Sequence, residues 1–146
     1  MGLYEVFFDL TRFEMHLWER LDEALRTEVG VPLGRFEALL VMRRLGPCRI
    51  LDVSRELALT VGGTSKLVDR LEVSGLCART PNPDDRRSSL IALDEKAGPI
   101  IDRGEAVIEA ALQASFGESL TEEQIASLRS HLRALRRAVN TSALAD

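Results

Sequence analysis

The residue types that perform catalysis are few and widely spaced in this chain of 146 residues. His16 and His131 fall in separate helical patterns, and Cys48 and Cys77 lack the spacing of a metal site. Motifs of zinc proteases, serine hydrolases and phosphate-binding loops are absent from the sequence. We therefore expect no enzyme, no catalytic residue, no metal and no cofactor, and we expect both thiols to be free and buried.

The stretch from Thr60 to Leu93 carries a different kind of chemistry. Thr60 has a side-chain oxygen suited to cap a helix, and the helix that follows begins with Gly62 and Gly63. Each glycine costs about 1 kcal/mol of helix stability relative to alanine. Close approach of the backbone to DNA is one reason to tolerate them, and flexibility or drift explains them equally well. We predict a core side of Val61, Thr64, Leu67, Val68 and Leu71, and a polar side of Gly62, Gly63, Ser65, Lys66, Asp69 and Arg70.

A basic hairpin follows this helix. After Gly75, residues 76–80 and 89–93 alternate in polarity as two paired strands would. The segment PNPDDRRS between them favours a turn, and it sets Asp84 and Asp85 beside Arg86 and Arg87, so that a carboxylate can orient a guanidinium. A solvated loop is the alternative. A helix followed by a basic hairpin is typical of a winged helix-turn-helix, whose helix enters the major groove and whose hairpin reaches phosphates or the minor groove.

The charge distribution bears on that interpretation. The net charge of −4 argues against simple affinity for nucleic acid, because Lys and Arg supply most non-specific binding. Residues 35–96, however, carry eleven basic and nine acidic groups, whereas residues 1–34 carry three and seven, and residues 97–146 carry five and seven. The middle of the chain is thus its only basic part, and the acidic flanks would orient the molecule on DNA.

Helical patterns surround the basic stretch. A long helix is predicted from Leu3 to Leu25, with an apolar stripe wider than one core face requires, so part of it should contact a partner subunit. Burial within a larger single core is the alternative. Further helices are predicted around residues 36–45, closed by Gly46 and Pro47, and around residues 51–57.

Two more helices are predicted after the hairpin. Asp94 can cap one that runs to Phe116, and Pro99 moves its start toward residue 98. Thr121 and Gln124 form a capping box for the last helix, which continues through Val139 before a tail from residue 141 to 146 frays. The fold class is mainly α with a small β-hairpin. No stretch approaches the roughly 20 apolar residues of a membrane span and the N-terminus is acidic, so we expect a cytoplasmic protein.

This order of elements, with LVDRLEVSGL at residues 67–76 and NPDDRRSSLIAL at residues 82–93, resembles the MarR (multiple-antibiotic-resistance regulator) family over nearly the whole chain. The resemblance implies a single MarR-like domain, residues 1–146. Its winged helix-turn-helix lobe would cover about 33–94, and its dimerisation helices about 3–27 and 95–139. The family's wing usually begins Asp-Pro, and Asn82-Pro83 stands there in this chain, without the charge that would repel phosphate.

The family pattern also implies roles for individual residues. Ser65 and Lys66 would face the major groove, and Arg70 would help at the DNA backbone. Arg87 would enter the minor groove, with Asp85 orienting it. The full set expected at DNA is Thr60, Gly62, Gly63, Ser65, Lys66, Arg70, Asp85, Arg86 and Arg87.

By the same resemblance, the protein is expected to be a homodimer that represses transcription from a pseudo-palindromic operator, with half-sites about 34 to 36 Å apart. Many relatives respond to a small aromatic or phenolic acid bound between the dimerisation helices and the lobe. The implied ligand residues are Arg12, His16, Trp18, Arg43 and Cys48, although an aromatic residue at helical spacing is more often part of a core. The alternative function is a winged-helix module that binds proteins and not DNA, and the importance of Arg86 and Arg87 distinguishes the two.

Overall fold

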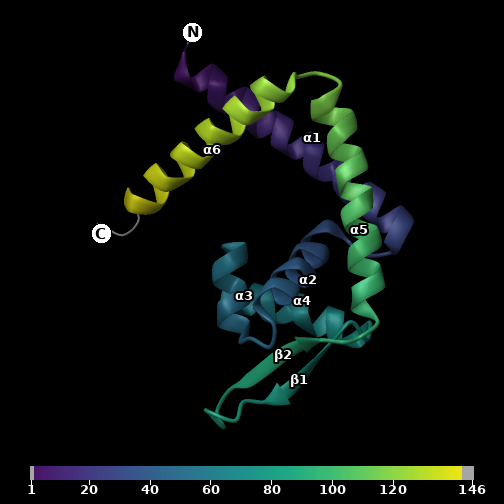
Figure 1. Cartoon of the computed structure of the whole chain (residues 1–146). Helices are drawn as coiled ribbons and strands as arrows, with labels where there is room; N and C mark the ends of the chain where they lie inside the picture. Colours follow the sequence, from purple (N-terminus) through teal and green to yellow (C-terminus); the bar gives the residue numbers. More distant parts are fainter. Residues whose placement is uncertain (1, 143–146) are drawn as a thin grey trace. The chain divides into compact units, whose positions relative to one another are not determined.

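Helices and one β-hairpin make up the computed structural model, which describes residues 2–142. The chain divides into two units that meet between Ile108 and Glu109. None of the described helices has the length and apolar character needed to cross a membrane. In Figure 1 the elements are, in order, α1 (Leu3–Val29), α2 (Leu33–Leu45), α3 (Ile50–Leu57), α4 (Val61–Val73), β1 (Cys77–Pro81), β2 (Ser89–Leu93), α5 (Ala97–Leu112), the π-helical turn η1 (Gln113–Gly117) and α6 (Glu122–Ser142).

The core of the first unit lies among the end of α1, α2, α3, α4, the hairpin and the start of α5. Its fully buried side chains are Leu25, Phe36, Leu39, Met42, Val53, Thr64, Val68, Leu71, Ile91 and Ile101. The predicted helix boundaries are confirmed to within a few residues, although α1 continues to Val29 and α2 begins at Leu33. Gly30 ends α1 with φ of 72°, and Gly75 turns the chain into β1 with φ of 72°, a backbone conformation that favours glycine.

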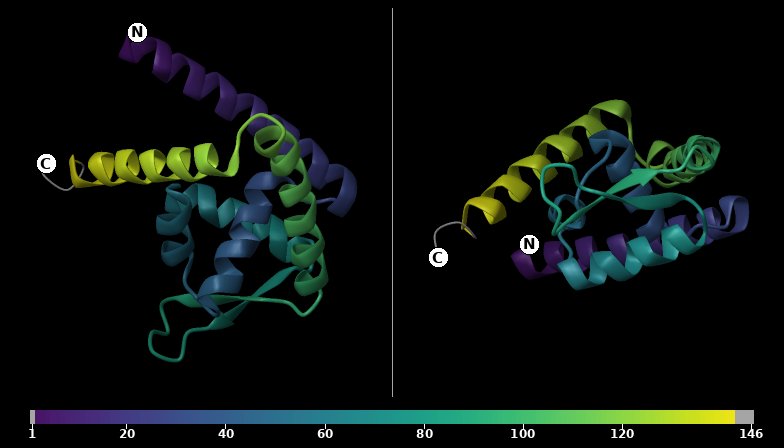
Figure 2. Two further views of the ribbon diagram at one scale, coloured as in Figure 1. Left: turned by 45° about the horizontal axis from the view of Figure 1, so that its top comes forward. Right: turned by 90° about the horizontal axis from the view of Figure 1, so that it is seen from below.

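The hairpin is antiparallel, with Cys77 opposite Leu93 and Pro81 opposite Ser89. The first strand therefore begins one residue later than predicted. Cys48, in the connection between α2 and α3, extends the sheet: its N–H donates to the Ile91 carbonyl (3.1 Å), and its carbonyl accepts from the Ile91 N–H (2.7 Å). The hairpin is thereby anchored at its base, and its tip projects away from α2, α3 and α4 (Figures 1 and 2).

The first turns of α5 pack tightly on α2 at a glycine. Gly104 is buried, and a Cβ atom at this position would lie 2.1 Å from Cε2 of the fully buried Phe36 ring. Ion pairs surround this contact: Arg43 of α2 binds Asp102 (2.9 Å) and Glu105 (2.5 Å) of α5. The start of α5 is therefore fastened to the core by a glycine contact and two carboxylates, none of which helical periodicity alone reveals.

The second unit consists of the end of α5, η1 and α6. The prediction that the fifth helix stays α-helical to Phe116 is wrong, because the backbone widens into a π-helical turn after Leu112. The capping box is confirmed: the Thr121 N–H donates to Gln124 Oε1 (2.8 Å), and the Gln124 N–H donates to Thr121 Oγ1 (3.3 Å). The helix continues to Ser142, past the predicted onset of fraying, and residues 143–146 of the predicted tail lie outside the described residues.

The contact between Gly104 and Phe36 predicts a stability defect. Gly104→Ala should lower the free energy of unfolding by about 1–3 kcal/mol, because the added methyl group overlaps a buried ring that has nowhere to move. Chemical denaturation measures the change. The matched control is Gly34→Ala in α2, where an added Cβ meets nothing within 4 Å and should be neutral or stabilising. Adding Phe36→Leu to Gly104→Ala should recover part of the loss, and wild-type stability of Gly104→Ala alone would contradict this account.

Candidate nucleic-acid interface

The helix α4 has the predicted cap and a buried side that joins the core. Thr60 Oγ1 accepts a hydrogen bond from the Gly63 N–H (3.1 Å), and Thr64 Oγ1 donates to the Thr60 carbonyl (2.9 Å). Thr64, Val68 and Leu71 are buried. The opposite side is open to solvent, with Gly62 and Lys66 both exposed. The polar side is therefore free to enter a groove.

Val61 departs from the predicted pattern. It was expected on the core side, yet 51% of its surface is exposed. Side chains on a helix lean toward its N-terminus, so a first-turn side chain points past the end of the helix. Val61 thus adds an apolar side chain to the leading end of α4, where a recognition helix contacts bases.

An arginine of the hairpin holds α4 and the wing together. Arg79 of β1 forms an ion pair with Asp69 (2.5 Å) and another with Glu72, both on α4. Its backbone N–H also donates to Glu72 Oε1 (3.0 Å). These contacts, led by the hydrogen bond that Arg79 donates to Asp69, raise the pKa of Arg79. Sequence reasoning did not find this brace, because the partners are seven and ten residues apart and meet only after the chain turns at Gly75.

The tip of the wing is ordered by hydrogen bonds to Asn82 and Asp85. Asn82 is 8% exposed, and its amide donates to Ser88 Oγ (2.9 Å) while its Oδ1 accepts from the Asp84 N–H (3.0 Å). Asp85 Oδ1 accepts from the Arg87 backbone N–H (3.0 Å), so this carboxylate orders the backbone and not a guanidinium, in contrast to the expectation from sequence. An aspartate at this position would have no amide N–H to donate to Ser88. Asn82 therefore orders the wing tip as well as removing a negative charge.

Ion pairing separates the arginines of the first unit into two groups. The paired arginines are Arg26, Arg43, Arg44, Arg49, Arg79 and Arg103. Among the described side chains, by contrast, no carboxylate lies within ion-pair distance of Lys66, Arg70, Arg86 or Arg87. Those four side chains are exposed on α4 and at the wing tip. These four cations lie at the surface that a winged helix-turn-helix presents to DNA, although the whole chain is acidic. Within residues 2–142 the other cations of the first unit without an ion pair are Arg12, Arg20, Arg35, Arg55 and Lys96.

The two glycines of α4 differ in their surroundings. A Cβ at Gly63 would lie 3.1 Å from the capping oxygen of Thr60, which gives this residue a role within the protein. A Cβ at Gly62 would meet nothing within 4 Å. No contact within the described protein therefore requires a glycine at residue 62, although glycine costs helix stability there.

Comparison with known proteins agrees with this geometry. The model of the MarR family matches residues 31–89, from the start of α2 to the start of β2. Over residues 31–89 the chain is similar to the MarR family. It is 23% identical to the multiple antibiotic resistance protein MarR of Escherichia coli over 110 residues, which cover 75% of this chain and 76% of that protein.

Two solved structures show how far the MarR-family fold extends. The transcriptional repressor CouR, solved on a 23-mer DNA duplex, matches with a TM-score of 0.82 and 22% identity, covering 88% of this chain and 90% of CouR. The organohalide-sensing regulator RdhR, solved with 2,4-dichlorophenol, matches with a TM-score of 0.84 and 20% identity, covering 94% of this chain and 82% of RdhR. At these identities the likeness shows the fold alone.

The ligand residues expected for a MarR-family protein lie in separate places. The guanidinium of Arg12 lies 4.5 Å from the Phe8 ring centroid, and His16 is exposed on the same helix. Trp18 lines a cleft beside α4, Arg43 is paired with α5, and Cys48 lies at the base of the wing. One protomer therefore does not gather these five side chains into one cavity. Within the described residues, no cluster of His, Cys, Asp or Glu side chains is arranged to hold a metal ion.

Both cysteines are free and buried, as predicted. Burial raises the pKa of the Cys77 thiol to about 11, and the neighbouring Glu72 adds to the effect. Burial also raises the pKa of Cys48, with a further contribution from Asp52. Since the thiolate is the reactive form, neither site favours a redox role.

The raised pKa values predict slow thiol chemistry in the folded protein. At pH 8 iodoacetamide should label neither Cys48 nor Cys77 while the protein is folded, because the thiolate fraction is small and access is blocked. In urea, where both pKa values return toward normal, both should be labelled quickly, as mass spectrometry of peptides can show. Rapid labelling of either residue in the folded protein would revive the idea of a redox switch.

Proposed function

We propose that this chain represses transcription by binding DNA sequence-specifically as a homodimer, in the cytoplasm, with α4 in the major groove and the wing tip at the neighbouring minor groove. The observation that carries the proposal is the group of unpaired cations on α4 and the wing tip. In a chain with a net charge of −4, these four side chains have no described carboxylate within ion-pair distance and are available for phosphates. CouR, of the same fold, was solved on DNA and is a repressor.

The expected DNA contacts follow from this placement. Ser65, Lys66 and the backbone at Gly62 face bases or the groove edge, and Thr60 positions the first turn. Arg70 contacts the DNA backbone. At the wing, Asp85 holds the backbone of Arg87, which enters the minor groove beside Arg86.

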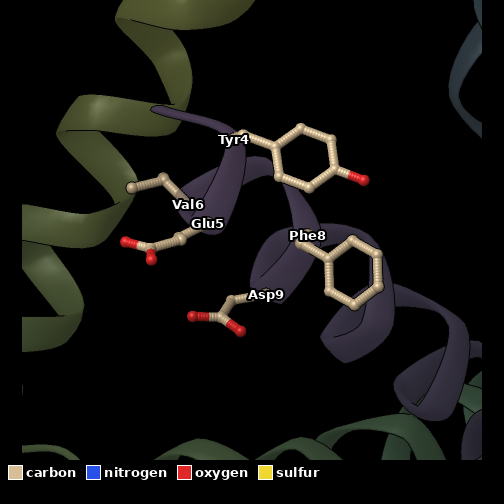
Figure 3. A pocket seen from close by; sticks show the side chains of 5 residues that line it. All are labelled: Tyr4, Glu5, Val6, Phe8 and Asp9. Carbon is tan, nitrogen blue, oxygen red and sulfur yellow. The ribbon is translucent and has the colours of Figure 1, made fainter. Parts of the chain in front are cut away.

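Exposed apolar side chains on α1 and α6 support the homodimer. Tyr4 and Phe8 stack with ring centroids 5.8 Å apart on one side of α1, away from Glu5 and Asp9 (Figure 3). The exposed apolar side chains are Leu3, Tyr4, Val6, Phe7, Phe8, Leu10, Phe13, Met15 and Trp18 of α1, and Leu132, Leu135 and Val139 of α6. Exposed apolar side chains on each of these two helices mark a protein interface, and we assign them to a second copy of the chain.

A small aromatic or phenolic acid is the class of effector that we propose, because RdhR, of the same fold, was solved with 2,4-dichlorophenol. Arg12, His16, Trp18, Arg43 and Cys48 remain the candidate contacts. Since one protomer keeps them apart, such a site would need the second copy or a change in the spacing of the two lobes. An effector that binds one spacing better than the other would shift the population away from the DNA-binding form.

Selection of bound sequences from a random DNA pool tests the function. The expected result is an inverted repeat with half-sites about 34–36 Å apart. Arg87→Ala should bind the same sequences more weakly, with a salt slope smaller by about one for each phosphate that the variant no longer neutralises. The matched control is Arg20→Ala, which removes one exposed charge from α1 and should change neither. A pool without enrichment would favour the protein-binding module.

Gly62 offers a second test, in which stability and binding move in opposite directions. Gly62→Ala should raise the free energy of unfolding by up to about 1 kcal/mol, because alanine favours the helix and the added Cβ meets no protein atom. The same methyl group should weaken operator binding if the backbone approaches DNA closely. Thermal unfolding and operator titration measure the two effects. Unchanged affinity in a stabilised variant would place Gly62 away from DNA.

A further inference from the structure

A cleft of about 460 Å³ lies beside α4, on the side away from the Arg79 brace. Its walls come from three helices of the first unit: Trp18, Asp22 and Arg26 of α1, Arg35 of α2, and Lys66 and Arg70 of α4. Lys66 and Arg70 are four residues apart, so they lie next to each other on one face of the helix. We call this feature the α1–α4 cleft.

Arg35 is the unusual member of the α1–α4 cleft. Its side chain is half-buried, yet within residues 2–142 it has neither an ion pair nor a hydrogen bond to a carboxylate. A partly desolvated guanidinium without an acceptor is costly, and it retains five donors in a planar fork that suits the oxygens of a phosphate. Arg35 is therefore prepared for an anion that the protein itself does not supply.

Asp22, the carboxylate within the α1–α4 cleft, is not available to pair with Arg35. Asp22 Oδ2 accepts from Arg26 Nε (2.6 Å), and Asp22 Oδ1 accepts from the backbone N–H of Leu33 at the start of α2 (2.7 Å). These bonds, above all the one from Arg26, lower the pKa of Asp22. The charges of Asp22 and Arg26 are thus matched to each other, and Arg35, Lys66 and Arg70 give the cleft its net positive charge.

The geometry of a helix in the major groove identifies the anion. A helix with its side chains is about 10–12 Å across and the groove is about 12 Å wide, so both flanks of α4 must lie against phosphate backbones. On one flank, Asp69 and Glu72 are paired with Arg79, which offsets one of their two charges, and the wing follows. On the other flank lies the α1–α4 cleft.

We propose that the α1–α4 cleft binds a phosphodiester of the operator backbone, with Arg35 as its principal ligand and Lys66 and Arg70 beside it. This inference rests on the proposed function. It assigns a DNA contact to α2, outside the recognition helix and the wing. Each half-site then has one phosphate strand held by the wing tip and the opposite strand held by Arg35.

Neutral methylphosphonate linkages, placed one at a time along a selected operator duplex, test the assignment. Wild-type affinity should fall about tenfold at one linkage in each half-site that lies across the groove from the wing, as expected when a charge-assisted hydrogen bond is removed. Arg35→Ala should bind the unmodified duplex about as weakly, and the same linkage should then weaken binding little further. Its salt slope should fall by about one for each phosphate that Arg35 neutralises in the wild type.

Two variants control for charge and for folding. Arg20→Ala removes the same charge from α1 without touching the cleft, and it should keep both the affinity and the methylphosphonate pattern of the wild type. Arg35→Lys keeps the charge without the planar fork, so it should retain the salt slope while losing affinity a few-fold. If Arg35→Ala does not fold, the affinity and the salt slope of Arg35→Lys can still be measured.

The possible outcomes separate the two proposals. If wild-type protein shows no salt-dependent binding to any selected duplex, the proposed function and this inference both fail. If it binds, but Arg35→Ala remains as sensitive to the same linkage as the wild type, only this inference is overturned. Equal weakening of Arg35→Ala on every modified duplex would likewise overturn it, because that pattern indicates an indirect structural effect.

Discussion

The ion pairs between acidic side chains and arginines of the first unit are the constraint on which the proposed binding of DNA depends. Asp69 lies on the exposed part of α4 and would repel phosphate if it were unpaired. Arg79 pairs with it and with Glu72 and so offsets one of these two negative charges, and the same contacts tie the wing to α4. One arginine therefore sets the charge of the surface and also joins the two elements expected to contact the two grooves.

This arrangement explains how an acidic chain can present a cationic surface. Several acids of the first unit fasten helices to one another, as Asp102 and Glu105 fasten α5 to Arg43. Lys66, Arg70, Arg86 and Arg87 lie where no described carboxylate reaches them. A few unpaired cations give only modest affinity for phosphates, so sequence-independent binding to DNA is limited. Contacts with bases therefore have more influence on which DNA sequence the protein binds.

Local chemistry was predictable from sequence, and contacts between distant segments were not. The Thr60 cap, the glycine turns at Gly30 and Gly75 and the capping box at Thr121 all follow from residues within a few positions of each other, and the structure has each of them. The Arg79 brace and the contact of Gly104 with Phe36 join segments that meet only in the folded chain. Val61 was misassigned because periodicity alone does not account for the end of a helix.

The salt dependence of wild-type operator binding tests the central claim most directly. If Arg86 and Arg87 each meet a phosphate, and Arg35, Lys66 and Arg70 together neutralise one more, both protomers neutralise about six phosphates. The logarithm of the binding constant should then fall with the logarithm of salt concentration with a slope of about −5. Fluorescence anisotropy between roughly 50 and 300 mM salt covers the necessary range. A slope of about −3 or shallower would contradict the account, because it would mean that most of these cations do not contact the DNA backbone.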